Sequence, residues 1–216
     1  MSQLFDIESW KRKEHFHFFK DFEEPFFGIT FDADVTYLYE HCKKEKISIY
    51  AGYLYAILKA VNHIKEFRLR IKEDNTVILY DRIGVSATVN RENNTFGFSH
   101  VEYDEDFNEF LISLKVETER VELSNALFPD KKNDDVIYFS ALPWVKFTGL
   151  SHARSYRIRE SVPRISTGKI YTSGQRRLMP VSVHVHHAMM DGYHVGLFVE
   201  KLQQILNEEL IKSRTV

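Results

Sequence analysis

The sequence predicts an α/β fold in which about five helices cover one large mixed β-sheet, a two-layer arrangement. Several stretches repeat apolar residues every three or four positions, as helices with one buried face do. Others alternate apolar and polar residues, as half-buried strands do. The two kinds of stretch are interleaved, and no internal repeat, low-complexity tract or Pro/Gly-rich linker divides the chain. We therefore expect a single domain over residues 1–216.

The first half of the chain is predicted to be mostly helical. An apolar stripe formed by Leu54, Ile57, Leu58 and Val61 predicts a largely buried helix over residues 50–64. The other elements expected are helices over 6–21 and 35–45, an extended segment over 25–31, and a hairpin of 68–72 with 76–80.

The chain after residue 80 is predicted to supply most of the sheet. Asp104 can cap a helix whose apolar stripe begins at Phe107 and ends at Val121. A further amphipathic stripe predicts a helix over 195–206. Extended segments are expected over 83–89, 95–101, 136–141, 143–150, 164–171 and 181–186.

The composition excludes several classes of protein. The 29 basic and 31 acidic side chains nearly cancel, which argues against a nucleic-acid partner. The N-terminus lacks the pattern of a signal peptide, and no apolar stretch approaches the ~20 residues needed to cross a bilayer. The single cysteine, Cys42, excludes an intramolecular disulfide and fits a reducing compartment. We therefore expect a soluble cytoplasmic protein without a nucleic-acid or membrane partner.

The most informative segment is HHAMMDG, residues 186–192. Just before it, Val181, Val183 and Val185 alternate with polar residues, as in a strand with one buried face. A helical stripe follows it, so the segment connects a strand to a helix, and Gly192 is expected to allow a turn that a Cβ would obstruct. Side chains at such a connection are held rigidly yet face a cleft. We interpret the segment as a catalytic centre.

The residues alone leave three roles open for these histidines. A neutral imidazole can act as a general base, which contributes roughly 10²–10⁴-fold to a rate. Asp191 can support it by binding His187 directly, or by holding the connecting loop through a salt bridge to an arginine. A zinc site formed by His184, His186 and His194 is chemically possible. The third role is purely structural, with each ring hydrogen-bonded inside the fold.

The segment HHAMMDGYHVG, residues 186–196, resembles the active-site signature of the chloramphenicol acetyltransferases. The resemblance extends from about residue 5 to residue 205 through blocks in the same order. These blocks are WKRKEHF at 10–16, FRLRIK at 67–72, TF at 95–96, FP at 128–129, SALPWV at 140–145 and LMP at 178–180. The resemblance implies the acyltransferase fold that this family shares with the catalytic domain of dihydrolipoyl acyltransferases.

The resemblance also implies roles for individual residues. His187 corresponds to the general base, and Asp191 to a structural aspartate whose arginine partner corresponds to Arg12. His186 is expected to support the fold. The aromatic residues expected to line the acceptor pocket are Phe19, Phe27, Phe96 and Phe98.

Several positions depart from the family pattern. Gly149 stands where the family usually has a serine that stabilises the oxyanion, and loss of one such donor can cost about 10²–10³ in rate. Thr148 is adjacent but is expected to face the other way, whereas Ser166 is expected to keep a hydroxyl nearby. Ile170 replaces a tyrosine near the cosubstrate, with Tyr171 one residue along. His184 and Phe98 also differ, replacing a glutamine and a small residue.

The implied reaction is transfer of acetyl from acetyl-CoA to the primary hydroxyl of chloramphenicol. The resemblance implies a ternary complex without an acyl-enzyme, a metal or a permanently bound cofactor. It also implies a homotrimer whose active sites lie between subunits. Gly149 and Phe98 keep two alternatives open, namely a related acyltransferase for another small alcohol or amine, and a weakly catalytic ligand-binding relative.

Overall fold

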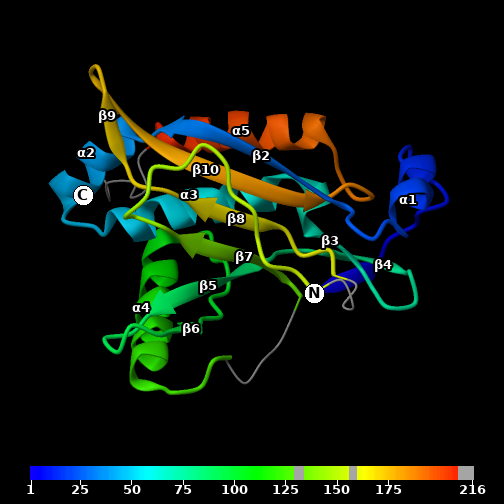
Figure 1. Cartoon of the computed structure of the whole chain (residues 1–216), viewed down its shortest axis with the longest axis horizontal. Coiled ribbons are helices and arrows are strands. Elements are labelled where there is room, and N and C mark those ends of the chain that lie inside the picture. The colour runs from blue at the N-terminus through cyan, green and yellow to red at the C-terminus, as the bar shows by residue number, and fades with distance from the viewer. Residues whose placement is uncertain (129–133, 156–159, 209–216) are drawn as a thin grey trace.

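The main β-sheet places the end of one long strand beside the N-terminal helix (Figure 1). In the computed structural model, which describes residues 1–128, 134–155 and 160–208, its strand order is β2-β10-β8-β7-β5-β6, with β9 paired to β10. The strands are β2 (Phe26–Asp34), β5 (Gly84–Asn90), β6 (Phe96–Phe98), β7 (Val136–Ala141), β8 (Arg164–Thr167), β9 (Tyr171–Ser173) and β10 (Arg176–His186). β5, β7 and β8 run parallel and the other pairs are antiparallel, so the predicted mixed sheet is confirmed.

Helices α2, α3 and α5 pack on one face of this sheet and close the predicted two-layer arrangement. Ser48 caps α3 by accepting a hydrogen bond from the backbone N–H of Ala51 at 3.5 Å. The helices are α1 (Lys13–Phe19), α2 (Thr36–Glu45), α3 (Ile49–His63), the short 3₁₀ helix η1 (Lys65–Arg68), α4 (Phe107–Leu123) and α5 (Gly192–Leu206).

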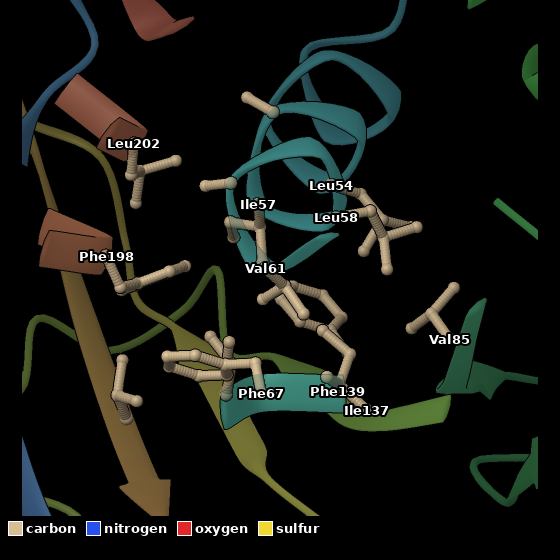
Figure 2. Packing of buried hydrophobic residues seen from close by; sticks show 14 of the residues in the cluster. Leu54, Ile57, Leu58, Val61, Phe67, Val85, Ile137, Phe139, Phe198 and Leu202 are labelled. Carbon is tan, nitrogen blue, oxygen red and sulfur yellow. The ribbon is translucent and has the colours of Figure 1, made fainter. Parts of the chain in front are cut away.

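The core lies between α3, α5 and the sheet. Figure 2 shows Ile57 on the side of α3 toward Phe198 of α5 and Leu54 on the side toward Val85 of β5, with Phe139 of β7 below them. Leu54, Ile57, Val61 and Phe198 are fully buried, and Phe139 is 2% exposed. The predicted stripe of α3 therefore forms the centre of the core, where each fully buried large apolar side chain contributes roughly 1.5–3 kcal/mol.

A small second sheet has the order β1-β4-β3, formed by β1 (Ser2–Leu4), β4 (Val77–Tyr80) and β3 (Leu69–Ile71). β3 and β4 are the predicted hairpin. Arg70 of β3 is completely buried and donates hydrogen bonds to the backbone oxygens of Asp134 at 2.5 Å and Val136 at 2.6 Å. These bonds attach the small sheet to the start of β7.

Two of the expected elements are wrong. The helix expected over 6–21 is reduced to α1, because Asp6 Oδ1 accepts the backbone N–H of Glu8 at 3.0 Å and stabilises a turn instead. The segment expected to be extended over 143–150 turns at its start, where Val145 N donates to Leu142 O at 3.1 Å. In both segments, a hydrogen bond between residues two or three positions apart forms a turn in place of the expected element.

β10 determines where the histidine segment lies. It is hydrogen-bonded to β2 on one side and to β8 on the other, so its position is fixed at both edges. Val181, Val183 and Val185 are fully buried in the core, as their alternation predicts. In the described part of the chain, no helix is long and apolar enough to cross a membrane.

Candidate active site

His187 follows β10 directly and lies between two aromatic rings. Its backbone N–H donates to Pro25 O at 2.8 Å, which extends the pairing with β2 by one residue. The Phe19 ring stacks on its imidazole, with centroids 4.0 Å apart and planes 3° apart. Phe27 contacts the same imidazole with centroids 4.7 Å apart. The imidazole is therefore confined by Phe19 of α1 and Phe27 of β2.

Arg12 connects the N-terminal segment to this histidine. Its Nη1 forms a salt bridge with Asp191 Oδ2, and its Nη2 donates to the backbone oxygen of His187 at 3.3 Å. The Arg12 side chain is 12% exposed and that of Asp191 is 31% exposed, so the guanidinium is shielded from water while the carboxylate remains partly accessible. Of the two ways in which Asp191 can support His187, the structure has the salt bridge to an arginine. The partners of the Asp191 carboxylate are Arg12, Tyr193 and His194.

Asp191 also begins helix α5. Its Oδ1 accepts the N–H of Tyr193 at 3.0 Å and lies 2.9 Å from Nδ1 of His194. Partial burial alone would raise the pKa of Asp191, but the hydrogen bond from His194 and the charge of Arg12 outweigh it and hold that pKa below its usual range. Asp191 is therefore ionised at neutral pH and serves as a helix cap and an ion-pair partner together.

His186 lies on the other side of the strand from His187 and is 4% exposed. Its Nδ1 accepts the backbone N–H of Ala188 at 3.2 Å, and its ring contacts Phe26 edge-on. Burial, followed by the positive charge of Arg154, lowers the pKa of His186 to about 3. His186 therefore stays neutral and fixes the backbone that follows His187.

The expected role of Gly192 is wrong. A Cβ built on Gly192 would meet nothing within 4 Å, and its backbone is outside the left-handed region. The turn that glycine was expected to allow is made instead by Met189 and Met190, whose N–H groups bond to His186 O at 2.9 and 3.2 Å. Any small residue would fit at the first position of α5.

Phe96 and Phe98 lie far from His187 in the same chain. They belong to β6, which β8, β7 and β5 separate from β10. At about 4.8 Å per strand, this places β6 about 19 Å from β10 across the sheet. Phe98 stacks on Phe128 with ring centroids 5.1 Å apart, and Phe96 is 45% exposed. The four aromatic residues expected in one pocket therefore form two separate pairs.

The residues expected near the oxyanion and the cosubstrate lie at the same end of the sheet as Phe98. Ser166 pairs with Ser182 of β10, five residues before His187, or about 16 Å along the strand. Tyr171 of β9 donates its hydroxyl to Asp32 Oδ2 at 2.8 Å. Thr148 and Gly149 are exposed in the loop after β7, and a Cβ on Gly149 would meet nothing within 4 Å.

A row of hydroxyl side chains crosses the sheet at this level. Ser182 is paired with Thr30 on one side and with Ser166 on the other, and Ser166 is paired in turn with Ser140. Thr88 donates to Ser140 Oγ at 3.4 Å. Ser166 is completely buried, and its Oγ has no hydrogen-bond partner in the described parts of the chain. Since a buried hydroxyl without a partner is costly, Ser166 is the member of the row best suited to bind another group.

The histidines considered for zinc are separated in the structure. His184 lies over Gly28 and against the ring of His152, with centroids 4.9 Å apart. Burial lowers the pKa of both rings, that of His152 to about 4. His194 is on α5, beside Asp191. Across the described residues, no three His, Cys, Asp or Glu side chains converge in a way that could hold a metal ion.

His194, considered from the sequence as a zinc ligand, is instead a residue of the helix cap beside the candidate site. Its contact with Asp191 forms a capping box, because the two residues occupy the N-cap and N3 positions of α5. The signal was present in the sequence as an aspartate followed three residues later by a polar side chain at the start of an apolar stripe. A capping box usually has Glu or Gln at N3, so the histidine at this position does not by itself indicate one.

The comparison with known proteins decides the family. The family model described as chloramphenicol acetyltransferase matches residues 2–203. The chain belongs to the chloramphenicol acetyltransferase family. Chloramphenicol acetyltransferase 3 from Escherichia coli is 33% identical over 208 residues, which cover 95% of this chain and 97% of that protein. The chloramphenicol acetyltransferase from Staphylococcus aureus is 30% identical, covering 95% and 96%.

Solved structures share the fold of this chain. A chloramphenicol acetyltransferase structure superposes with a TM-score of 0.85 at 30% identity, covering 95% of this chain and all of that chain. The cubic core of the pyruvate dehydrogenase multienzyme complex superposes with a TM-score of 0.64 at 12% identity, covering 85% and 82%. This second likeness shows the shared fold alone. The chain is thus an acyltransferase-family protein with the predicted chloramphenicol acetyltransferase fold.

Proposed function

We propose that this protein transfers acetyl from acetyl-CoA to the primary hydroxyl of chloramphenicol, with His187 as the general base. The observation that carries the proposal is the confined imidazole of His187, stacked on Phe19 and joined through its backbone oxygen to Arg12. Membership of the family over residues 2–203 supports the acceptor and the acetyl donor. Acetyl-CoA is a cosubstrate in this proposal, and no metal or permanently bound cofactor takes part.

The reaction follows from the two nitrogens of His187. Nδ1 is buried, so Nε2 is the nitrogen that can face a substrate. Neutral Nε2 takes the proton of the hydroxyl while the hydroxyl oxygen attacks the thioester carbonyl carbon. The tetrahedral intermediate then breaks its C–S bond, and the CoA thiolate receives the proton from Nε2. Both substrates are bound together, so no acyl-enzyme forms.

Arg12 and Asp191 take no proton in this mechanism. Asp191 holds Arg12, and Arg12 holds the backbone oxygen of His187, so together they fix the direction of the imidazole. Phe19 and Phe27 contact the ring and restrict its movement. Orientation of this kind matters because a misplacement of about 1 Å can cost about 10²-fold in rate.

The proposed oxyanion site differs from that of the family. Gly149 offers no hydroxyl, and we assign the remaining donor role to the buried Oγ of Ser166. Tyr171, held by Asp32 and covered by the Lys146 ammonium 3.7 Å from its ring centroid, is the proposed aromatic contact for the cosubstrate in place of Ile170. Both assignments place these contacts at the end of the sheet away from His187.

We further propose that the protein is a homotrimer whose subunits complete each other's sites. One chain carries the base after the C-terminal end of β10, while Ser166 lies five residues back along β10, beside Ser182, and Phe98 lies on the edge strand β6. Both halves are flanked by exposed apolar side chains, such as Phe18 at 65% and Trp144 at 69% exposed. Exposed apolar surface of this kind marks interfaces between subunits.

A different acceptor is the second candidate function. Phe98 is stacked against Phe128 and occupies space that a small residue leaves free, so it narrows the proposed acceptor pocket. Gly149 offers no hydroxyl where the family usually has a serine. These two positions favour a smaller alcohol or amine as acceptor. A weakly catalytic ligand-binding protein is the further possibility, in which ligands bind without release of CoA.

The test is release of CoA thiol by purified protein with acetyl-CoA and each of several acceptors, with the product identified by its mass. The proposal predicts chloramphenicol-dependent release that is lost in His187→Ala and kept in His63→Ala, a change at an exposed histidine at the end of α3. Release with another acceptor alone would assign that substrate instead. Tight binding of chloramphenicol without any release would favour the ligand-binding alternative.

A further inference from the structure

His194 is held between two carboxylates behind the catalytic segment. Its Nδ1 lies 2.9 Å from Asp191 Oδ1, and its Nε2 lies 3.7 Å from Glu66 Oε1 of η1. The His194 residue is 8% exposed, and the Glu66 side chain is 19% exposed. The ring therefore spans from η1 to the start of α5 inside the protein.

The geometry points to His194 as a positioning residue for His187. The two oxygens of Asp191 bind different partners, since Oδ1 receives His194 and Oδ2 receives Arg12. Arg12 in turn donates to the backbone oxygen of His187. A continuous set of contacts thus runs from Glu66 through His194, Asp191 and Arg12 to the residue that carries the imidazole.

The role of His194 depends on whether its Nδ1 carries a proton, because this decides which group of Asp191 the ring binds. Nδ1 also lies 3.2 Å from the backbone N of Asp191, so it can accept that N–H only when Nδ1 itself is unprotonated. The shorter contact is to the carboxylate, and a proton on Nδ1 makes it a hydrogen bond. With that proton, His194 fixes the rotation of the Asp191 carboxylate. Without it, backbone N–H groups and Arg12 hold the carboxylate, and its rotation is less restricted.

The same conclusion follows from what the ion pair needs. The Asp191 side chain is 31% exposed, so water can compete for its oxygens. Besides the N–H of Tyr193, the ring of His194 is the group that binds Oδ1. Removing the ring takes away the side-chain partner of Oδ1, and the Arg12 contact to Oδ2 loses part of the support that orients it.

The test uses variants of His194 that keep different parts of its hydrogen bonding, and it rests on the proposed acetyl transfer. In His194→Asn the side-chain amide replaces Nδ1, in His194→Gln it replaces Nε2, and His194→Leu has neither. We expect kcat to fall by up to about 100-fold in the Leu and Gln variants, with KM for both substrates within about twofold, and to remain near wild type in His194→Asn. Gln204→Ala, an exposed change on the same helix, serves as the control.

A double variant of His194 and Arg12 distinguishes a positioning role of His194 from a general effect on stability. The double variant Arg12→Gln/His194→Leu should be no slower than Arg12→Gln alone, because both changes break the same set of contacts. Equal loss in the Asn and Leu variants, with equally lowered thermal midpoints, would overturn the proposal in favour of a structural role. A folded Leu variant with unchanged kcat would overturn it as well.

A readout without substrate keeps the inference independent of the acceptor. The ring ¹⁵N signals of His187, assigned by their loss in His187→Asn, should shift in His194→Leu and Arg12→Gln but keep their positions in His194→Asn. Unchanged His187 signals in His194→Leu would overturn the positioning role even if the protein turned over another acceptor. Absence of chloramphenicol turnover by the wild type, with the expected signal shifts present, would instead contradict the proposed function alone.

Discussion

Arg12 and His187 are 175 positions apart in the sequence and are joined by a hydrogen bond of 3.3 Å from the guanidinium to the backbone oxygen. The same guanidinium forms the salt bridge with Asp191. The N-terminal segment is therefore part of the catalytic centre, although it lies far from the histidine motif along the chain. A single side chain holds both ends of the loop that carries the base.

Arg12→Gln tests this relationship. The amide is too short to reach both Asp191 and the oxygen of His187, so the loop loses one or both contacts. We expect kcat to fall by about 10²-fold with a small change in KM, because binding is preserved while the base is misplaced. Lys11→Gln, a change at the exposed neighbouring residue, should leave both constants unchanged. An Arg12→Gln variant with normal kcat would show that the loop holds its shape without the arginine.

Gly149→Ser tests the missing oxyanion donor. The added Cβ would meet no atom within 4 Å, so the fold tolerates a serine there. If the tetrahedral intermediate is short of a donor, the new hydroxyl should raise kcat by up to about 10²-fold. Steady-state kinetics of the variant beside Ser166→Ala measures it. If Gly149→Ser gives no gain while Ser166→Ala is strongly impaired, Ser166 already compensates fully.

Acid should destabilise the protein through its buried histidines. The pKa of His186 is lowered to about 3 and that of His152 to about 4, from an ordinary value of 6.5. Between those values the unfolded chain binds more protons than the folded one, so the free energy of unfolding falls as pH drops from about 6.5 toward 4. Their contribution is complete above pH 6.5.

The change His152→Gln checks this at fixed protein concentration. The urea midpoint of the wild type should fall as pH is lowered from 7 to 4.5, and the fall should be smaller in His152→Gln. His63→Gln, at an exposed histidine, should behave as the wild type does. Parallel pH profiles of wild type and His152→Gln would contradict a depressed pKa at His152.

The oligomeric state is a further expected outcome. Size-exclusion chromatography with light scattering should report a mass close to three chains of 25.5 kDa each. Activity should fall when dilution or mild denaturant dissociates the trimer, because one chain holds its two half-sites at opposite ends of the sheet. A monomer with full activity would contradict the shared-site arrangement.

The sequence predicted those parts of the fold that depend on local periodicity. The stripe of Leu54, Ile57 and Val61 and the alternation of Val181 and Val183 each bury one face, and both lie in the core as expected. Gly192 was misjudged because the space around a backbone atom depends on tertiary neighbours. In this protein those neighbours leave the position open.

The arrangement of the site depends on strand order, which no local pattern contains. Phe27 and Phe96 are expected to line a pocket shared between subunits, and within one chain β2 and β6 form opposite edges of the main sheet. The contact of His194 with Asp191 was visible as a capping-box spacing, while its contact with Glu66 requires η1 to fold against α5. The pairing of Arg12 with Asp191 was predicted from the family resemblance, because residue spacing cannot indicate which arginine binds Asp191.

Mixed subunits test the central claim most directly. His187→Ala removes the base, and Phe96→Glu places a charge in the proposed acceptor half, so each variant should be inactive alone. Co-expressed with different tags and purified as mixed trimers, they should regain acetyl transfer to chloramphenicol at about one third of the sites, where an intact His187 meets an intact Phe96 of the neighbouring chain. Mixed trimers without any activity, formed from variants that fold and assemble, would contradict a site in which His187 acts on a substrate held by the neighbouring chain.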